Sequence, residues 1–320
     1  MFYDGFYAMI RSKDVKNVIP FERLDLNQKE KYEAYLCRLG DHGCEYSFAN
    51  KFLWGRQKAA FLNDYLVLFS QFDRKSIYPF PIGDGDLRPI LDAVIHDARA
   101  RGIPCYLSGM SKADCDRVEE LYPGMFRFHL DRDSFDYVYS IDDLADLKGR
   151  KFQKKRNHAN RFDAEHPDYR ILPLDENTRV GAFCMLQNWY KNRAEIDPLN
   201  DFHLEKLAAE RAFAFYQQLG LEGIVLMDGG EVIAFTMGSF LTPDTVDVHF
   251  EKAREDIPGA YNVINREFAR YLRAKYPDLR WLNREDDVGL EGLRKAKLSY
   301  NPDHMVEKYW ARLWEEEDEN

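Results

Sequence analysis

The alternation of apolar and polar positions predicts the same order of elements twice along the chain. The first stretch, residues 64–139, begins with strand-like runs and continues with a segment whose apolar residues recur at helical spacing. Its predicted elements are strands at 64–73 and 75–83, a helix at 87–100, a strand at 103–107, a short helix opened by Ser111, and strands at 126–130 and 135–139.

The second stretch, residues 224–310, repeats this order. Its first two strands are joined by Asp-Gly-Gly at 228–230, which is typical of a tight hairpin. The predicted elements are strands at 224–227, 232–240 and 245–250, a helix at 260–275, a strand at 279–283, a short helix at 289–298 and a strand at 305–310.

Each stretch therefore predicts a meander of strands, a long helix, a strand, a short helix and a final strand segment. A helical pattern at 28–39 precedes the first stretch, and two more at 178–192 and 203–218 precede the second. This repeat of pattern predicts an α+β protein with two tandem domains, residues 1–140 and 141–320.

The composition agrees with an ordered globular chain. The protein has 320 residues, 45% of them hydrophobic, which suffices for about two domains of ordinary size. No window approaches the roughly 18 apolar residues of a membrane span, and no signal-peptide pattern is seen, so we expect a cytoplasmic location. The five cysteines are odd in number and lack CxxC spacing, which favours free thiols and implies no metal.

The net charge of −10 opposes broad binding of nucleic acid, but one local patch is basic. Residues 148–161 contain seven Lys or Arg and no acid, and they fit an amphipathic helix with an apolar stripe of Phe152, Ala159 and Phe162. The residues predicted to face outward and to bind phosphates or tRNA are Lys154, Asn157, His158 and Arg161. A solvated helix between domains, or contact with an anionic membrane surface, is the alternative.

A second cationic cluster lies in residues 292–302, GLRKAKLSYNP, directly before the last predicted strand. Lys295 and Lys297 project about 200° apart on a helix, so both cannot face one site. Lys295 is the stronger candidate for a site, and Lys297 is expected to face water. A solvated helix face is the simpler alternative.

Carboxylates that could act as a general base follow the strand at 281–283. Glu285 and Asp286 are the first candidates, and His249 and Glu251 at the end of an earlier strand are alternatives. Loop acids of this kind also cap the following helix, which is the simpler interpretation.

The order of elements resembles a duplicated member of the GNAT acyltransferase superfamily. In that fold two parallel strands separate, and the next helix presents its N-terminus to the pyrophosphate of an acyl donor. The corresponding turn is residues 254–264. Only Arg254, Gly259 and Ala260 match the coenzyme A signature of that superfamily, and Gly259 and Ala260 become candidate phosphate-binding residues by this resemblance.

The segment GLRKAKLSYNP is similar to GLRKxKxxxxP in the catalytic domain of lysyl-phosphatidylglycerol synthases. The matching residues are Gly292, Leu293, Arg294, Lys295, Lys297 and Pro302. The similarity extends weakly over 140–310 and identifies the phosphatidylglycerol lysyltransferase C-terminal domain family. It implies an aminoacyltransferase with aminoacyl-tRNA as donor, no other cofactor, and an amine or hydroxyl acceptor, a class that includes lipids at a membrane surface.

By that resemblance Lys295 would stabilise the oxyanion of the transfer, and Glu285 and Asp286 would be catalytic carboxylates or would bind the substrate amine. The candidate substrate-binding residues are Asn283, Arg284, Arg294, Lys297, Glu251, Trp189 and Tyr190. Trp189 and Tyr190 could equally belong to a helical core stripe. An acyl-coenzyme A N-acyltransferase and a non-catalytic binding module stay open as alternatives, as do the transferred group, the acceptor and the oligomeric state.

Overall fold

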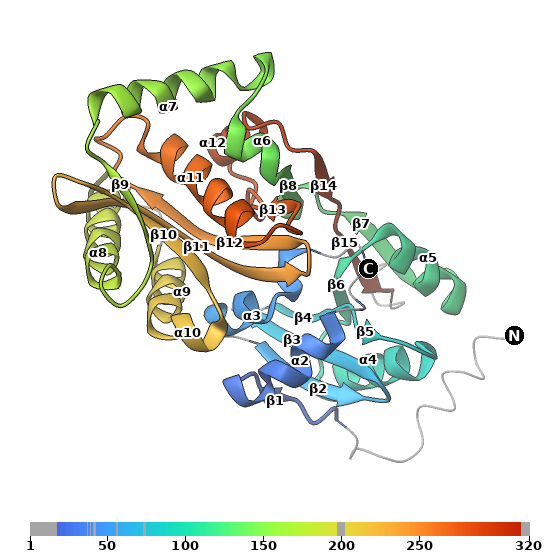
Figure 1. The fold of residues 1–320 in the computed structure, drawn as a ribbon. Helices are drawn as coiled ribbons and strands as arrows, with labels where there is room; N and C mark the ends of the chain where they lie inside the picture. The colour runs from blue at the N-terminus through green and yellow to red at the C-terminus, as the bar shows by residue number, and fades with distance from the viewer. Residues whose placement is uncertain are drawn as a thin grey trace, which may run out of the picture.

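The expected fold class is confirmed: the protein is α+β, with two mostly antiparallel sheets and helices packed on their faces (Figure 1). The computed structural model describes residues 18–36, 38, 40, 43–55, 57–72, 75–196 and 202–314. Within these residues, no helix has the length and apolar character needed to cross a membrane.

The first sheet has the spatial order β1-β2-β3-β4-β6-β15-β7, with β5 paired to β3. Only β4 and β6 run parallel, and they pair through Tyr78–Leu107 and Pro79–Ser108. The strands are β1 (Glu22–Arg23), β2 (Gln57–Leu62), β3 (Tyr65–Phe72), β4 (Lys75–Pro79), β5 (Ile82–Gly83), β6 (Tyr106–Met110), β7 (Phe126–Leu130) and β15 (Tyr309–Leu313).

The second sheet has the order β14-β8-β13-β12-β11-β10-β9. Its one parallel pair is β12 and β13, and the hairpin predicted from Asp-Gly-Gly joins β10 to β11. The strands are β8 (Asp136–Ser140), β9 (Arg170–Pro173), β10 (Glu222–Asp228), β11 (Glu231–Thr242), β12 (Thr245–Ala253), β13 (Trp281–Asn283) and β14 (His304–Val306).

The two sheets exchange one strand each. β8, from the first half of the chain, lies between β13 and β14, whereas β15, from the second half, lies between β6 and β7. The expectation that each half keeps its own last strand is therefore wrong, and the strand predicted at 305–310 is two strands in different sheets. Both sheets take strands from both sides of residue 140. The domain boundary between residues 140 and 141 stays a prediction.

The helices form three layers around the two sheets. Their bounds are α2 (Lys29–Leu36), α3 (Phe48–Trp54), α4 (Arg88–Arg101), α5 (Lys112–Leu121), α6 (Ile141–Asp146), α7 (Gln153–Glu165), α8 (Arg179–Ile196), α9 (His203–Ala214), α10 (Tyr216–Leu219), α11 (Ala260–Lys275) and α12 (Glu291–Leu298), with short 3-10 turns η1 (Leu26–Gln28), η2 (Cys44–Tyr46), η3 (Arg132–Ser134) and η4 (Arg150–Phe152). α4 and α5 cover the first sheet, and α6, α7 and α11 cover the outer face of the second (Figure 1).

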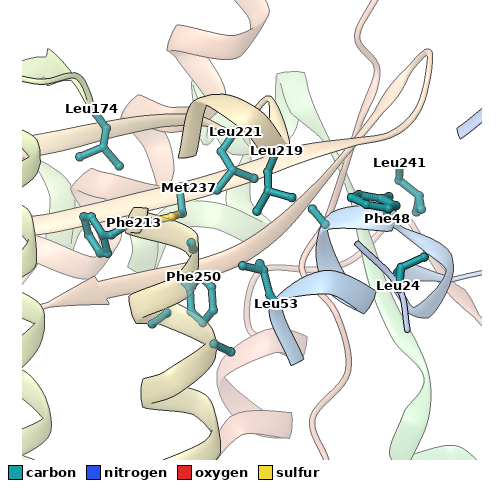
Figure 2. Close-up of a cluster of buried hydrophobic side chains, with 14 of the residues drawn as sticks. Leu24, Phe48, Leu53, Leu174, Phe213, Leu219, Leu221, Met237, Leu241 and Phe250 are labelled. Atoms are coloured by element: carbon teal, nitrogen blue, oxygen red, sulfur yellow. The ribbon is translucent and has the colours of Figure 1, made fainter. Parts of the chain in front are cut away.

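The middle layer, α2, α3 and α8 to α10, packs against both sheets and contains a shared core. Figure 2 shows part of it: Leu53 of α3 and Phe213 of α9 lie with Met237 of β11 and Phe250 of β12. Burial of this much apolar surface between the halves stabilises them as one body. The halves are therefore joined both by exchanged strands and by a common core.

Several local predictions are confirmed. The predicted long helices correspond to α4 and α11, and the apolar stripe of Phe152, Ala159 and Phe162 is fully buried beneath the basic segment. Cys44, Cys105 and Cys115 are buried free thiols, and the free thiol of Cys184 is exposed. Cys37 lies outside the described residues.

Candidate active site

Strands β12 and β13 form a fork. They pair in parallel through Thr245–Trp281, Val246–Leu282 and Asp247–Asn283, after which β12 continues to Ala253 and β13 ends. The chain leaves β13 through Glu285, whose φ of 56° places it in the left-handed region. We call this point the second fork.

The first sheet has an equivalent fork between β4 and β6, and an aromatic side chain fills it. The hydroxyl of Tyr46 donates to the carbonyls of Phe80 at 3.2 Å and Gly109 at 3.1 Å, and Tyr46 is fully buried. Burial raises the pKa of Tyr46 well above its usual value, so the hydroxyl stays neutral. The first fork is thus closed.

Arg284 spans the second fork. Its Nη2 donates to Glu251 Oε1 at 2.8 Å, and its guanidinium lies over the rings of Tyr300 at 5.0 Å and Tyr139 at 5.6 Å. Glu251 also accepts from Asn265 Nδ2 at 3.1 Å. The buried Arg284 Nη1 and Asn265 Oδ1 make no hydrogen bond with any described residue. The fork therefore offers one unused donor and one unused acceptor.

Lys155 lies at the same place on the inner face of α7. Its ammonium is 3.9 Å from the centre of the Tyr300 ring, and the Tyr300 hydroxyl accepts from Asn262 Nδ2 at 2.8 Å. Burial, followed by repulsion from Arg284, lowers the pKa of Lys155 to about 8. α7 thus places a cation over the fork.

Lys297 lies beneath the fork, and its expected direction is wrong. The side chain is buried, and its ammonium donates to the carbonyls of Arg284 and of Glu285, the latter at 3.1 Å. Burial, and then Arg284, lowers the pKa of Lys297. Lys297 therefore points inward because its ammonium binds main-chain carbonyls at the end of β13.

Lys295 faces solvent on the same helix. Its side chain is 73% exposed and pairs with Glu291 at 2.6 Å, one turn earlier on α12. The orientation of Lys295 therefore does not support a catalytic role.

Arg294, also on α12, contacts the loop after β13 and η3. It donates to Asp287 at 2.8 Å and to Asp133 at 2.6 Å. The Arg294 guanidinium holds the pKa of Asp287 well below its usual range.

Asn283 is the last residue of β13, and both polar atoms of its side chain make a hydrogen bond within the protein. Its Nδ2 donates to Asp136 Oδ2 at 2.8 Å, and its Oδ1 accepts from the Glu285 amide at 2.8 Å. It positions the loop. Asp286 makes no hydrogen bond to a described residue, and burial raises its pKa to about 7.

A second cluster of charges lies where the fork faces the first half of the chain. Lys308 donates to Asp136 at 2.5 Å and pairs with Glu45 at 2.6 Å. Burial alone would raise the pKa of Asp136, but the Lys308 ammonium and the hydrogen bonds from Asn283 and the Cys44 amide hold it below its usual value. This ion pair lies beside both exchanged strands.

His249 belongs to the same cluster. It is the residue of β12 without a partner where the register with β11 shifts, and its side chain is 2% exposed. Nδ1 lies 3.3 Å from Glu285 Oε1 and 3.4 Å from Asp247 Oδ2. Burial, and then Glu285, raises the pKa of Asp247 well above its usual value.

The predicted phosphate-binding face of α7 is exposed, as expected from its periodicity. Many cations of this segment already have partners: Lys151 pairs with Asp143 at 2.6 Å, and Arg161 pairs with Glu165 at 2.8 Å. Lys154 has no such partner among the described residues. The face therefore retains less free charge than its sequence suggests.

α7 also covers the start of α11. Gly259 has a φ of 92°, and a Cβ added there would lie 2.9 Å from the carbonyl oxygen of His158 and 3.0 Å from Phe162. The structure thus brings together His158, Gly259 and Ala260, three of the predicted phosphate-binding residues. However, a carbonyl oxygen packed on this turn opposes an anion at the same place.

Trp189 and Tyr190 lie on α8, on the far face of the second sheet. The Lys252 ammonium is 3.9 Å from the centre of the Trp189 ring. A groove of about 870 Å³ opens beside Trp189, between α8, the β10–β11 turn and residues 254–256. Tyr190 is buried in the shared core, in agreement with the core-stripe alternative.

Sequence reasoning missed Lys155, Asn265, Asp247, Cys44 and Lys308. One available signal was the polar alternation of Asp247, His249 and Glu251 within an otherwise apolar strand, because a buried strand carries charge only at a cost. Nothing in the sequence indicated that Cys44, some two hundred residues earlier, would meet them.

The repeated sheets and the fork between the parallel strands of the second sheet define a protein of GNAT-like acyltransferase fold. The chain belongs to the family described as phosphatidylglycerol lysyltransferase, C-terminal, whose model matches residues 37–312. Among curated relatives, an uncharacterized protein of Mycoplasmoides gallisepticum is 21% identical over 180 residues. That match covers 56% of each chain.

Solved structures support the same fold. A conserved protein of unknown function from Bacteroides thetaiotaomicron is 36% identical, with a TM-score of 0.86, over 92% of this chain and all of that one. The C-terminal domain of a putative lysylphosphatidylglycerol synthetase from Agrobacterium fabrum is 13% identical, with a TM-score of 0.66, over 92% and 94%. L-PGS from Bacillus licheniformis is 16% identical, with a TM-score of 0.59, over 94% and 93%.

Proposed function

We propose that this protein is an aminoacyltransferase that takes an aminoacyl group from aminoacyl-tRNA and passes it to an amine or hydroxyl acceptor. The observation that carries the proposal is the buried, unused Arg284 Nη1 at the second fork. Transfer from an ester passes through a tetrahedral oxyanion, and a fixed donor at that oxygen is usually the largest catalytic contribution. The family is named for lysyl transfer, which is a reaction of this kind.

The second fork supplies a different contact for each part of such a donor. Arg284, held by Glu251, donates to the carbonyl oxygen as it becomes an oxyanion. Asn265 Oδ1, the unused acceptor, binds the α-ammonium of the aminoacyl group. Lys155 binds a phosphate near the end of the tRNA by charge, without reading its sequence.

Coenzyme A is a less suitable donor at this fork. Its pyrophosphate would need the turn at Gly259, where the His158 carbonyl of α7 already packs. The donor we propose instead approaches the fork along α7, where Lys154 is exposed and unpaired among the described residues. This supports tRNA over the coenzyme.

The test measures transfer of a labelled amino acid from a panel of charged tRNAs to candidate amines, hydroxyl compounds and phosphatidylglycerol vesicles. We expect label to move from at least one tRNA to one acceptor. Transfer of an acetyl group from acetyl-coenzyme A, with none from tRNA, would overturn the proposal.

Lys155 gives a pH signature for donor binding. Because its ammonium loses its proton as pH rises through about 8, the affinity for uncharged tRNA at low salt should fall between pH 7 and 9. Lys155→Met should bind more weakly at pH 7 and lack this step. Lys58→Met, which removes an exposed lysine of β2, is the matched control and should behave as the parent. Equal pH profiles for Lys155→Met and the parent would exclude Lys155 from donor binding.

A further inference from the structure

Three side chains with metal-binding atoms, those of Cys44, Asp247 and Glu285, meet on the side of the second fork that faces the first half of the chain, and His249 lies beside two of them. Cys44 comes from η2, Asp247 and His249 from β12, and Glu285 from the loop after β13. The sulfur of Cys44 and carboxylate oxygens of Asp247 and Glu285 all lie within 4.8 Å of one another. His249 Nδ1 is 3.4 Å from Asp247 Oδ2 and 3.3 Å from Glu285 Oε1.

The charges of this cluster are not balanced by the protein. Lys308 neutralises Asp136 and Glu45, which form the neighbouring half of the cluster. Glu285 Oε1 accepts a hydrogen bond from Asn50 Nδ2 at 3.1 Å and lies 3.3 Å from His249 Nδ1, which donates to it only if Nδ1 carries the proton. Asp247 is fully buried, and neither of its oxygens has a hydrogen-bond partner among the described residues. A buried carboxylate without a partner is costly, and a bound cation would remove that cost and allow Asp247 to ionise.

The two distances from His249 suit a tetrahedral ion. Nitrogen and oxygen ligands lie about 2.1 Å from zinc, which separates two of them by about 3.4 Å at the tetrahedral angle. The distances from His249 Nδ1 to Asp247 and to Glu285 match that value. Thiol and imidazole ligands favour zinc and similar transition metals over magnesium or calcium, which prefer oxygen.

The orientation of His249 agrees with this role. Its Nε2 lies 2.8 Å from Ser239 Oγ. If Nε2 carries the proton and donates to Ser239, the lone pair of Nδ1 points at Asp247 and Glu285. A hydrogen bond to the outer nitrogen is the usual way in which a protein fixes a metal-binding histidine. Without a cation, that lone pair would face two carboxylates.

We propose that Cys44, Asp247 and Glu285 bind a divalent transition-metal ion, with His249 as the fourth ligand from the side of Asp247 and Glu285 and with zinc as the best fit. The ion would connect η2 of the first half to both strands of the second fork. This site does not depend on the proposed aminoacyl transfer, and the spacing of the cysteines in the sequence did not indicate it.

The test uses the purified full chain without an affinity tag, treated with a chelator and dialysed. Titration with CoCl₂ should give about one bound ion per chain and a thiolate-to-cobalt charge-transfer absorption, because Cys44 is the sulfur ligand. ZnCl₂ should displace the cobalt and raise the melting temperature, since an ion that binds only the native state stabilises it.

Three variants make the result specific. Cys44→Ser should lose the charge-transfer absorption, and Asp247→Asn should weaken cobalt binding at least about 10-fold while keeping that absorption. Cys184→Ser, which removes an exposed thiol of α8, should leave both unchanged. Circular dichroism checks that each variant folds. If Asp247→Asn does not fold, the result for Cys44→Ser decides by itself. Binding of no cobalt by the parent, or an unchanged absorption in Cys44→Ser, would overturn the proposal.

Discussion

The two forks have the same strand arrangement but opposite contents. In the first sheet, Tyr46 fills the fork between β4 and β6 and binds its carbonyls. In the second, Arg284 and Glu251 span the space between β12 and β13, and Arg284 retains a free donor. The two sheets therefore repeat the strand arrangement, but the side chains at their forks differ in chemistry. η2 takes part in both, because Tyr46 closes one fork while Cys44, two residues earlier, reaches the other.

The largest expected effect comes from emptying the second fork. Arg284→Met leaves Glu251 buried without its cation, which typically costs about 3 to 5 kcal/mol of stability. Loss of the donor to the oxyanion should also lower aminoacyl transfer by about 100-fold or more. Urea unfolding and the labelled-transfer assay measure the two effects.

A second variant separates charge from shape at this fork. Adding Glu251→Gln to Arg284→Met removes the uncompensated carboxylate, so part of the stability should return while transfer stays low. If transfer returns together with stability, Arg284 acts only by holding the fold.

The two lysines of α12 give the next effect. Lys297→Met leaves the Arg284 carbonyl without its donor, while the Glu285 carbonyl still accepts from the Tyr137 amide, and should cost about 1.5 to 3 kcal/mol. Lys295→Met breaks only an exposed pair with Glu291 and should change stability by less than about 0.5 kcal/mol. Unfolding midpoints compared at equal denaturant slope test this, and equal losses in the two variants would contradict the assignment of Lys297 to the fork.

The smallest effect is expected at the closed fork. Tyr46→Phe removes one hydroxyl that binds main-chain carbonyls and should cost about 1 kcal/mol. Transfer and cobalt binding should stay at the level of the parent, because the first fork carries no chemistry in this comparison. A loss of transfer similar to that of Arg284→Met would show that the two forks act together.

Hydrophobic pattern predicted most elements because each helix and strand buries one face. The exchange of β8 and β15 could not be predicted in this way. Both are short apolar strands that could pair with either sheet, and the choice depends on neighbours distant in sequence, such as the pair between Asp136 and Lys308.

The candidate site was predictable only in part. The spacing of Lys295 and Lys297 showed that they face opposite ways, but not which one faces inward. That choice is made by main-chain carbonyls near Glu285, and hydropathy does not report an ammonium that satisfies them. Glu251 and Arg284 were candidates from their places at strand ends, whereas Asn265 and Cys44 come from elements with no chemical signature.

The position of β15 sets the order in which the molecule can be completed during synthesis. β7 pairs with β15, and that strand leaves the ribosome long after β6 and β7 have appeared. Until then the edges of β6 and β7 are open, and the nascent first sheet must wait or be protected from other strands. The first sheet can therefore be completed only after nearly all of the second half has been synthesised.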